Sequence, residues 1–394
     1  MIGADEPMDA AMTQHFLLSP RARTLSLAKV MCLTDQAAET VFAAIRWADS
    51  NGKAICPRCK CTICYDCRRP NGAPRWRCKA CRSDFSLTSG TLFAFHKLAL
   101  RVYLAAIVLF INEVKGKSML ALSRDLDVQY KTAFVLAHKL REAMAAEIKA
   151  NALGGAGKVA EVDGAWFGGH VRPENRKADR KDRRLKENQS GKRKSVVVIR
   201  ERDGRTKTRV FKSEDESLAF IKANLDKATS VHADEAAAWN DLHGQFEMFR
   251  VNHQECYLGE DGACTNNAES YFSRLRRAES GHHHHLSGAY LHRYAQEMAF
   301  REDHRRDDNG KQFRRVIQLV TTNGPSVDFC GTKNGAVSAH LAGNITVAYE
   351  RADIVLAQVQ VRGNLLDAEN AVRHGEVPLV VEQRRGKAVR FGID

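Results

Sequence analysis

The sequence predicts a multidomain α+β protein in which a cysteine-rich module and a helical region precede a mixed α/β domain. Three features of the chain support this fold class. The stretch from Cys56 to Phe85 is rich in cysteine, interrupted by proline and glycine, and shows no helical period. Apolar residues then recur at helical spacing from Leu98 to about Glu147. Beyond the glycines that begin at Gly154, strand-like and helical segments alternate, as expected of a mixed α/β layer.

Composition and charge narrow the class of protein. The 394 residues include 61 lysines and arginines against 47 aspartates and glutamates, which gives a net charge of +14. At roughly 100–200 residues a domain, this length allows two or three domains and excludes a small disulfide scaffold. The excess positive charge favours an anionic partner such as nucleic acid.

The sequence shows no sign of a membrane span or an export signal. Its longest apolar stretch, from Val102 to Ile111, is about half of the ~20 residues that a membrane-spanning helix needs. The first residues carry acids where a secretory signal would carry lysine or arginine before an apolar core. We therefore expect a cytoplasmic protein without a membrane partner. In that reducing compartment its 11 cysteines indicate metal binding rather than disulfides.

Two CxxC pairs predict a structural zinc site. Cys56 and Cys59 form the first pair, and Cys78 and Cys81 form the second, eighteen residues further on. This spacing lets two turns converge on one tetrahedral ion through four thiolates. Three cysteines between them offer competing pairs, namely Cys61, Cys64 and Cys67. We favour the outer pairs, because the second one, followed by Phe85, resembles the second hairpin of a zinc ribbon. Whether the ribbon also contacts DNA stays open.

These patterns divide the chain into five segments. We expect a helical lead-in at residues 1–50, the zinc ribbon at 51–90 and a helix-turn-helix-like region at 91–150. The mixed α/β domain is expected at 155–310. No role is assigned to the tail at 311–394.

A helix-turn-helix outline follows the zinc ribbon. Ser118 is expected to cap a helix whose Leu120 and Leu122 face inward, and Asp127 and Val128 are expected to form a turn before a second helix. Five side chains on these helices are candidates for contact with phosphates or base edges: Arg124, Lys131, His138, Lys139 and Arg141. The alternative is a helical packing unit with an ordinary solvated face.

A second basic segment lies between His170 and Lys212, where 17 lysines and arginines stand against six acids. Such a charge run is often only a solvated loop, but neutralising a phosphate backbone is its most natural use. The predicted DNA contacts in it are Arg183, Arg184, Lys192, Arg193 and Lys194.

Three acids are candidates for a catalytic metal site. Asp163 ends one apolar strand-like run and Asp234 ends another. Two such acids side by side repel unless a divalent cation such as Mg²⁺ lies between them. Glu269 lies near the start of a later helix, where one turn aims it at the same ions, and Asn266 on that helix offers a carbonyl ligand. Arg276, two turns beyond Glu269, is placed to meet a phosphate.

Six stretches of the chain, taken in order, resemble the IS1595-type (ISXO2-like) transposases of bacterial insertion sequences. They are CPRC with RCKACRSDFSLTSGTLF, KSMLALSRDLDVQYKTAFVLAHKLREAM, AEVDGAWFGG, VHADEAAAW, TNNAESYFSRLRR and GHHHHLSGAYLHRYAQEMAFR. The resemblance extends from about residue 13 to about residue 320. It implies a zinc ribbon and a helical DNA-binding region joined to a ribonuclease H-like DDE catalytic domain.

The resemblance also assigns roles to individual residues. Asp163 matches the first acid of the family, Asp234 the second and Glu269 the third, while Asn266 competes for the third position because the family varies there. The expected cofactors are structural Zn²⁺ and two catalytic Mg²⁺ or Mn²⁺ ions. The expected partners are double-stranded DNA, both the ends of the element and the target, and further copies of the chain, acting at the bacterial nucleoid.

Smaller features carry weaker expectations. The run His282–His285 resembles a Gly-x-His-His segment of the family, so a substrate-contacting or helix-supporting role stands beside a plain solvated turn. Glu297 and Arg301 are expected to form a helix ion pair. Trp166 and Phe167 are expected to pack in the core or at a hinge.

The expected function is a transposase that binds terminal inverted repeats and catalyses metal-dependent strand cleavage and transfer. One alternative is a non-catalytic regulator that binds DNA through its zinc ribbon and helix-turn-helix. Another is a stand-alone ribonuclease H-like nuclease, which would cut DNA without joining it.

Overall fold

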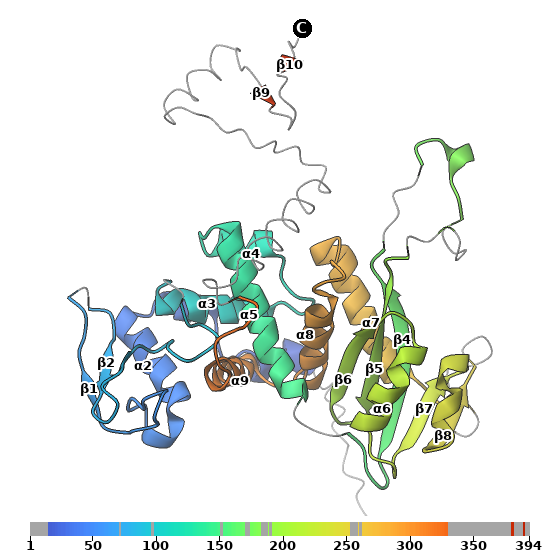
Figure 1. Cartoon of the computed structure of the whole chain (residues 1–394), viewed down its shortest axis with the longest axis horizontal. Coiled ribbons are helices and arrows are strands. Elements are labelled where there is room, and N and C mark those ends of the chain that lie inside the picture. The colour runs from blue at the N-terminus through green and yellow to red at the C-terminus, as the bar shows by residue number, and fades with distance from the viewer. Residues whose placement is uncertain are drawn as a thin grey trace, which may run out of the picture. The chain divides into compact units, whose positions relative to one another are not determined.

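The computed structural model describes residues 15–329, except for residues 71, 96–97, 150–152, 170–173, 183–187, 189–190, 253–258 and 260–261, and it also describes the backbone of residues 380–381 and 389–390. The chain divides into two compact units, Met1–Cys330 and Gly331–Asp394. In the second unit the described residues form two short antiparallel strands, β9 (Val380–Val381) and β10 (Val389–Arg390). The elements discussed below belong to the first unit (Figure 1).

The cysteine-rich module folds as a three-stranded antiparallel sheet made of β1 (Cys64–Asp66), β2 (Trp76–Cys78) and β3 (Asp84–Phe85). Its packing is aromatic: the Trp47 and Trp76 rings meet edge-on with their centroids 5.4 Å apart, and Trp76 stacks on Phe85 at 6.0 Å. Trp47 directly follows α2 (Asp35–Arg46), which α1 (Leu27–Met31) precedes. Aromatic packing therefore fastens the module to the helical lead-in.

Three helices follow the ribbon: α3 (Leu100–Asn112), α4 (Met119–Asp125) and α5 (Tyr130–Lys149). The expected cap of α4 is confirmed, because the Ser118 hydroxyl accepts a hydrogen bond from the amide of Ala121. Asp127 turns the chain between α4 and α5 with a left-handed φ of 49°. The expectation that Leu120 and Leu122 both face inward is wrong, since Leu122 is buried and Leu120 is 47% exposed. Leu120 and Leu122 are two residues apart, which is a rotation of about 200° around a helix, so their side chains cannot share one face.

The mixed α/β domain is built on a five-stranded sheet in the order β6-β5-β4-β7-β8. Its strands are β4 (Val159–Phe167), β5 (Lys194–Glu201), β6 (Thr206–Phe211), β7 (Ser230–Asp234) and β8 (Glu247–Val251). Strands β4, β5 and β6 form an antiparallel meander, and the chain turns between β5 and β6 at Asp203, whose φ is left-handed at 55°. Strands β7 and β8 lie on the other side of β4 and run parallel to it.

Different helices cover the two faces of this sheet. Val196 and Val198 of β5 pack with the core formed by α7 (Asn266–Ala278), α8 (Leu291–Asp303) and the helical region. Val197 and Ile199 pack with the core formed by α6 (Leu218–Asn224) and a 3₁₀ helix at Ala237–Leu242. Both faces of β5 are thus apolar, as in a sheet covered on both sides.

The last helix of the first unit is α9 (Asn309–Thr322), which packs against α2, α3 and α5. It begins with Asp308, whose carboxylate accepts a hydrogen bond from the amide of Lys311. The helix crosses the boundary that the sequence placed at residue 310. Helices from both ends of the unit therefore pack together around α3.

Candidate active site

The two predicted aspartates lie side by side on neighbouring parallel strands. The expectation that Asp163 ends its strand is wrong, because β4 continues to Phe167 by pairing with β5. On its other side, β4 pairs with β7 up to the partners Val162 and Ala233. Strand β7 ends one residue later at Asp234, as expected. Asp163 therefore lies where β4 loses its parallel neighbour, next to the end of β7.

Strand alternation points both aspartates toward α7. Val162 and Ala233 belong to the core on the α6 side of the sheet. Because side chains alternate along a strand, Asp163 and Asp234 face the opposite side. That side carries Ala165 of β4 and the buried residues of α7.

Glu161 anchors the helix that carries Glu269. Its buried Oε2 accepts hydrogen bonds from the amides of Asn267, at 2.7 Å, and Ala268, at 3.0 Å, in the first turn of α7. A carboxylate at a helix N-terminus satisfies free amides and is favoured by the helix dipole. Its Oε1 forms an ion pair with Arg202 at 3.0 Å. Sequence reasoning missed Glu161; the available signal was an acid within an otherwise apolar strand.

The acids of this region act on one another electrostatically. Burial, together with the charges of Asp234, Glu269 and Glu214, raises the pKa of Asp163 to about 7, against a smaller opposing effect of the Gly164 amide. Carboxylate oxygens are the donors that Mg²⁺ and Mn²⁺ prefer, and a divalent cation would relieve this repulsion. The donor set therefore fits such ions.

Asp234 is held in place by the segment that follows it. Its Oδ1 accepts hydrogen bonds from the indole nitrogen of Trp239, at 2.6 Å, and from the amide of Ala236, at 3.2 Å. Trp239 is itself buried in the core on the α6 side. The stretch VHADEAAAW thus provides both an acid and the side chain that orients it.

A fourth acid, Glu214, lies against Gly164 of β4 and was missed by sequence reasoning. Its Oε1 accepts a hydrogen bond from the Ser195 hydroxyl at 3.3 Å. A Cβ atom on Gly164 would lie 2.8 Å from this oxygen, so a larger residue here would displace the carboxylate from its present position. Burial raises the pKa of Glu214, as does the charge of Asp234. The available signal was a glycine inside a strand, directly after Asp163.

Asn266 and Arg276 occupy the two ends of α7. Asn266 is exposed at its first position and lines a groove together with Glu269. Arg276 is exposed near the last turn, where its charge acts on Glu279. Of the two candidates for the third position, Glu269 is the one whose charge acts on Asp163.

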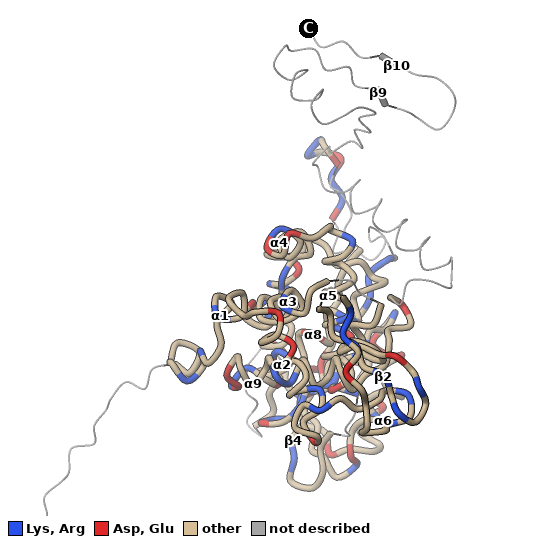
Figure 2. The backbone as a smooth tube through the Cα atoms, turned by 90° about the vertical axis from the view of Figure 1, so that its left-hand side faces the viewer, with Lys and Arg blue, Asp and Glu red and all other residues tan. Residues whose placement is uncertain are grey.

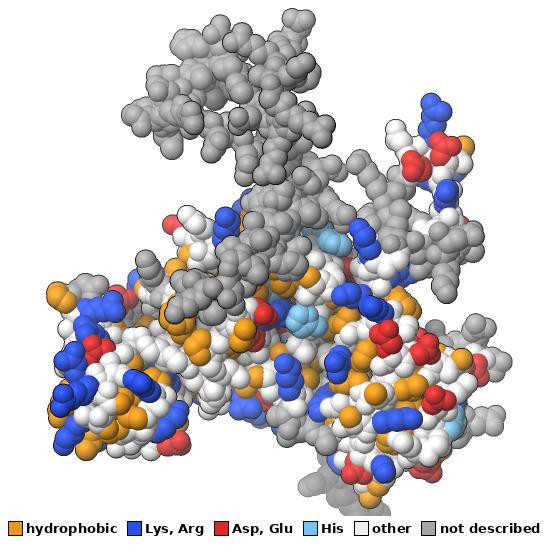
Figure 3. All heavy atoms as spheres, viewed as in Figure 1, with side chains coloured by type: hydrophobic (Ala, Val, Ile, Leu, Met, Phe, Trp, Pro, Cys, Tyr) orange, Lys and Arg blue, Asp and Glu red, His pale blue; other side chains and the backbone are white. Residues whose placement is uncertain are grey.

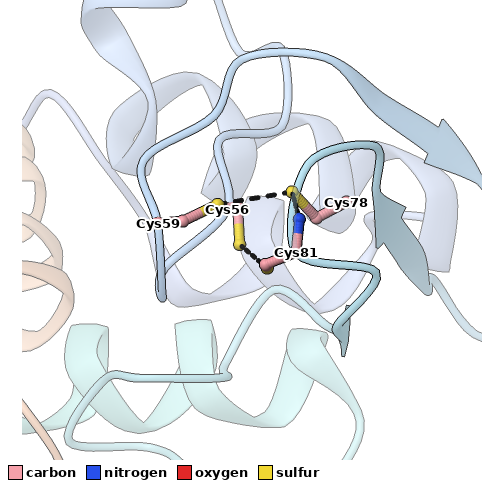
Figure 4. Close-up of side chains that lie close together, drawn as sticks. All are labelled: Cys56, Cys59, Cys78 and Cys81. Carbon is pink, nitrogen blue, oxygen red and sulfur yellow. Dashed lines mark hydrogen bonds between the residues drawn. The ribbon is translucent and has the colours of Figure 1, made fainter.

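The four outer cysteines converge as the spacing predicted (Figure 4). The Sγ atoms of Cys56 and Cys81 are 3.6 Å apart, those of Cys59 and Cys78 are 3.5 Å apart, and all four lie within 4.8 Å of one another. A tetrahedral zinc with Zn–S bonds of about 2.3 Å places its sulfurs about 3.8 Å apart. These residues therefore suit Zn²⁺. Within the described residues this is the only group of three or more potential ligands that meets that 4.8 Å limit, so the carboxylates are spread more widely.

Two predicted DNA contacts in the helix-turn-helix are wrong, because Lys139 and Arg141 are buried. The Arg141 Nε donates to Glu297 Oε2 at 2.6 Å, and its guanidinium lies 4.1 Å from the centroid of the Tyr294 ring. His138, the other candidate nearby, is buried as well. Arg124 and Lys131 are exposed, which leaves them available to DNA. A buried guanidinium needs a partner, and α8 supplies it across the interface with α5.

The expected ion pair between Glu297 and Arg301 is confirmed, with 2.7 Å between its charged atoms. Burial alone would raise the pKa of Glu297, but the charges of Arg141 and Arg301 outweigh it and lower this pKa to about 2. His283 contacts this network, since its ring centroid lies 4.8 Å from that of Tyr294. His283 thus supports α8, while His284 and His285 are exposed.

The basic segment after Asp163 is divided between a loop and strands. Arg183 and Arg184 lie outside the described residues. Lys192 is exposed, whereas Arg193 and Lys194 are half-buried, and the Lys194 ammonium donates to the carbonyl of Gly288 at 3.2 Å. Further basic residues of the segment lie on β5 and β6, where buried Arg200 pairs with Asp303 at 2.7 Å. Not all of the local charge is therefore available to DNA.

Basic side chains also gather on the zinc ribbon, where we predicted no individual DNA contacts from the sequence. In the described part of the first unit, lysines and arginines recur along the backbone with acids between them (Figure 2). They line the outer edge of the zinc ribbon (Figure 3), and its exposed members are Arg58, Lys60, Arg68, Arg69, Arg77, Lys79 and Arg82. Trp166 is 39% exposed on β4, while Phe167 is buried as expected.

Two family models match the chain. The transposase zinc-ribbon domain matches residues 33–84, and the ISXO2-like transposase domain matches residues 153–303. The protein is therefore a transposase with an N-terminal zinc ribbon and a mixed-sheet domain. It belongs to the IS1595 family, as the resemblance implied. No match to it was found among the curated proteins or the solved structures. Among the described residues, no helix combines the length and apolar character needed to span a bilayer.

Proposed function

We propose that this protein binds the terminal inverted repeats of its insertion sequence, cleaves DNA strands there and joins them to a target. The observation that carries the proposal is the position of Asp163 and Asp234 on neighbouring parallel strands, facing the helix that bears Glu269. Membership of a DDE transposase family supports DNA binding and nuclease or transposase activity. The sheet would then be the ribonuclease H-like core that the resemblance implies.

Asp163, Asp234 and Glu269 would hold two Mg²⁺ or Mn²⁺ ions, with Asn266 as the alternative third ligand. When bound, such ions stabilise the charge on the attacking and leaving oxygens of an in-line phosphoryl transfer. The three acids are spaced more widely than the four cysteines. This wider spacing suits a site with two metal ions, because the two ions lie about 3.5–4 Å from each other in such sites.

The protein contributes positioning rather than a side-chain nucleophile. Trp239 fixes Asp234, and Glu161 fixes the start of α7, so the carboxylates are oriented before DNA arrives. Water attacks first and the freed 3′-hydroxyl attacks next, so no covalent enzyme intermediate is needed. Exposed Arg124 and Lys131 are proposed to bind DNA. The same role is proposed for the five basic residues predicted from the segment after Asp163, namely Arg183, Arg184, Lys192, Arg193 and Lys194. Arg276 is proposed to contact a phosphate.

Joining two element ends to one target requires both to be held in one complex. We therefore propose that the protein works as a homo-oligomer on DNA. The outer edge of the zinc ribbon, with its exposed arginines and lysines, adds a second surface that suits phosphates.

The test is strand transfer by Asp163→Asn on a duplex bearing the element end, with a target plasmid and with or without Mg²⁺. We expect the wild-type protein to cleave and join only with Mg²⁺, and the variant to lose both steps by at least about a thousandfold while still binding the duplex. The matched control is Asp241→Asn, which removes an exposed acid outside the site.

Each alternative function has its own outcome in this assay. Binding without Mg²⁺-dependent nicking by the wild-type protein would identify a non-catalytic regulator. Cutting without joining would identify a stand-alone nuclease. Cleavage and joining by Asp163→Asn would refute the assignment of the catalytic acids.

A further inference from the structure

A groove of about 580 Å³ runs along the exposed side of α7, and Asn266 and Glu269 line one end of it. We call it the α7 groove. Asn266, Glu269, Ser273 and Arg277 line it at intervals of three or four residues, which places them on one face of the helix. The opposite wall is formed by the turn after α3 and the end of α8, including Lys115 and Arg305. The groove therefore leads from a predicted catalytic acid along the whole helix.

The charge of the α7 groove is positive at its far end. Its acids are Glu269 and Glu302, and its cations are Lys115, Arg274, Arg277 and Arg305. Glu302 is already engaged, because Arg274 pairs with it at 2.5 Å and Arg305 lies at 3.6 Å. Arg274 also donates to the carbonyl of Val114 at 3.1 Å, which ties the two walls together.

Two of the exposed cations in the groove are not engaged with Glu302. Lys115 and Arg277 form no ion pair with any acid that the structure describes. They lie on opposite walls, one on the turn after α3 and the other near the end of α7. A ligand lying in the groove would therefore meet a cation on each side.

The other lining groups indicate the chemistry of that ligand. Ser270, Ser273 and Asn266 offer hydroxyl and amide donors, the kind that contact phosphate oxygens beside lysine and arginine. Among the described lining residues none is aromatic, so the groove has no platform for stacking bases. The volume lies within the range of about 300–1,000 Å³ that is typical of ligand sites.

We propose that the α7 groove holds the sugar-phosphate backbone of a DNA strand beside the carboxylates, without reading its base sequence. This inference rests on the proposed function and adds to it the path by which a strand reaches the site. Lys115 and Arg277 supply the contacts that neutralise phosphates, while the bonds of Arg274 to Glu302 and to the carbonyl of Val114 hold the two walls at a fixed spacing.

The experiment compares the double variant Lys115→Ala/Arg277→Ala with wild-type protein in binding to end-bearing and unrelated duplexes without Mg²⁺, over a range of salt. Each lost phosphate contact lowers the slope of log affinity against log salt by about 0.9. We expect the slope to fall by about two and the affinity for both duplexes to fall about tenfold near 0.15 M salt. The charge-preserving variant Lys115→Arg/Arg277→Lys is expected to restore both.

The matched control is Arg306→Ala/Arg314→Ala, which removes the same charge from exposed positions outside the groove. An equal loss in this control would show a general charge effect and overturn the inference. A loss confined to the end-bearing duplex would also overturn it, because it would mean sequence reading. If the wild-type protein cleaves and joins DNA while the groove variant binds normally, the inference fails alone. If the wild-type protein does neither, the proposed function fails.

Discussion

The zinc ribbon and the carboxylate edge of the sheet are both suited to metal, but they are assembled in opposite ways. The four cysteines come from two nearby turns, and their sulfurs already lie within 4.8 Å of one another. The acids come from two strands and a helix far apart in sequence, and their charges repel across a buried region. The first arrangement converges through local turns, whereas the second depends on the register of the whole sheet.

The two sites are therefore expected to have opposite effects on the stability of the folded state: the zinc site raises it, and the carboxylates without a cation lower it. A structural zinc supplies folding free energy to a module too small to build a large core. Buried acids without a cation lower the stability of the folded state, because their charges repel one another. Binding of metal ions and substrate removes this repulsion and so stabilises the folded state. Removing a metal-binding side chain should therefore destabilise the protein at the zinc ribbon and stabilise the metal-free protein at the carboxylates.

The largest effect is expected at the ribbon. Cys78→Ser removes a buried zinc ligand, and structural zinc sites supply about 10 kcal/mol or more of apparent folding free energy in small zinc modules. We expect the variant to lose its zinc and the packed arrangement of Trp47, Trp76 and Phe85. Metal analysis and near-ultraviolet circular dichroism measure these two losses.

The matched control for this change is Cys61→Ser, because the Cys61 thiol lies outside the four-sulfur cluster and interacts with the carbonyl of Ile63 at 3.7 Å. It should keep its zinc and its dichroism. Loss of zinc from Cys61→Ser, with zinc retained in Cys78→Ser, would reverse the choice between the competing CxxC pairs.

The same contrast explains how much could be predicted from sequence. The ribbon ligands follow from spacing alone, because a short chain with two CxxC turns has few ways to converge. Asp163, Asp234 and Glu269 could be named from their places on strands and a helix. Their supports could not, since Glu161 and Glu214 reach the site only through strand register and a missing Cβ on Gly164.

The helical region shows the other limit of sequence reasoning. Lys139 and Arg141 have the residue types and spacing of DNA contacts, yet both are buried. The Lys139 ammonium donates to the carbonyl of Ala94 at 3.4 Å, and α8 packs over Arg141. Basic character on an amphipathic helix indicates an exposed face only when no partner helix supplies an acid. Glu297 lies more than 150 residues away from Arg141, so no local pattern reveals that pairing.

A smaller and opposite effect is expected at the carboxylate edge. In zinc-loaded protein without Mg²⁺, Asp163→Asn should increase the free energy of unfolding by roughly 1–3 kcal/mol at pH 8, because it removes a buried charge whose pKa is raised to about 7. Between about pH 4 and pH 7 the folded state keeps the Asp163 proton that the unfolded state has lost. Stability of the wild-type protein therefore falls as pH rises through this window.

Denaturant unfolding at pH 5 and pH 8 tests this prediction. The advantage of Asp163→Asn should be large at pH 8 and shrink toward pH 4, whereas exposed Asp241→Asn should show no such trend. Destabilisation by Asp163→Asn at both pH values would remove the contrast with the ribbon.

The smallest effect is expected at a joint that uses no metal, where α5 meets the end of α8. Glu147 on α5 lies 3.3 Å from the His304 Nε2 and 3.0 Å from Arg315, and the His304 Nδ1 lies 2.7 Å from Asp307. Burial alone would raise the pKa of Glu147, but its hydrogen bonds with His304 and Arg315 lower it to about 2. Burial alone would lower the pKa of His304, but its hydrogen bonds with Glu147 and Asp307 raise it above 6.5.

These opposite shifts fix the pH range in which the joint is strong. The contribution of Glu147 is present above about pH 4.5 and is lost as pH falls toward 2, while that of His304 is present below about pH 6.5 and is lost as pH rises through its raised pKa. His304→Gln should therefore lower the free energy of unfolding by about 1 kcal/mol at pH 6 and by less at pH 9. Exposed His243→Gln is the control, and an equal loss at both pH values in His304→Gln would show that packing, rather than the charged hydrogen bonds, holds the joint.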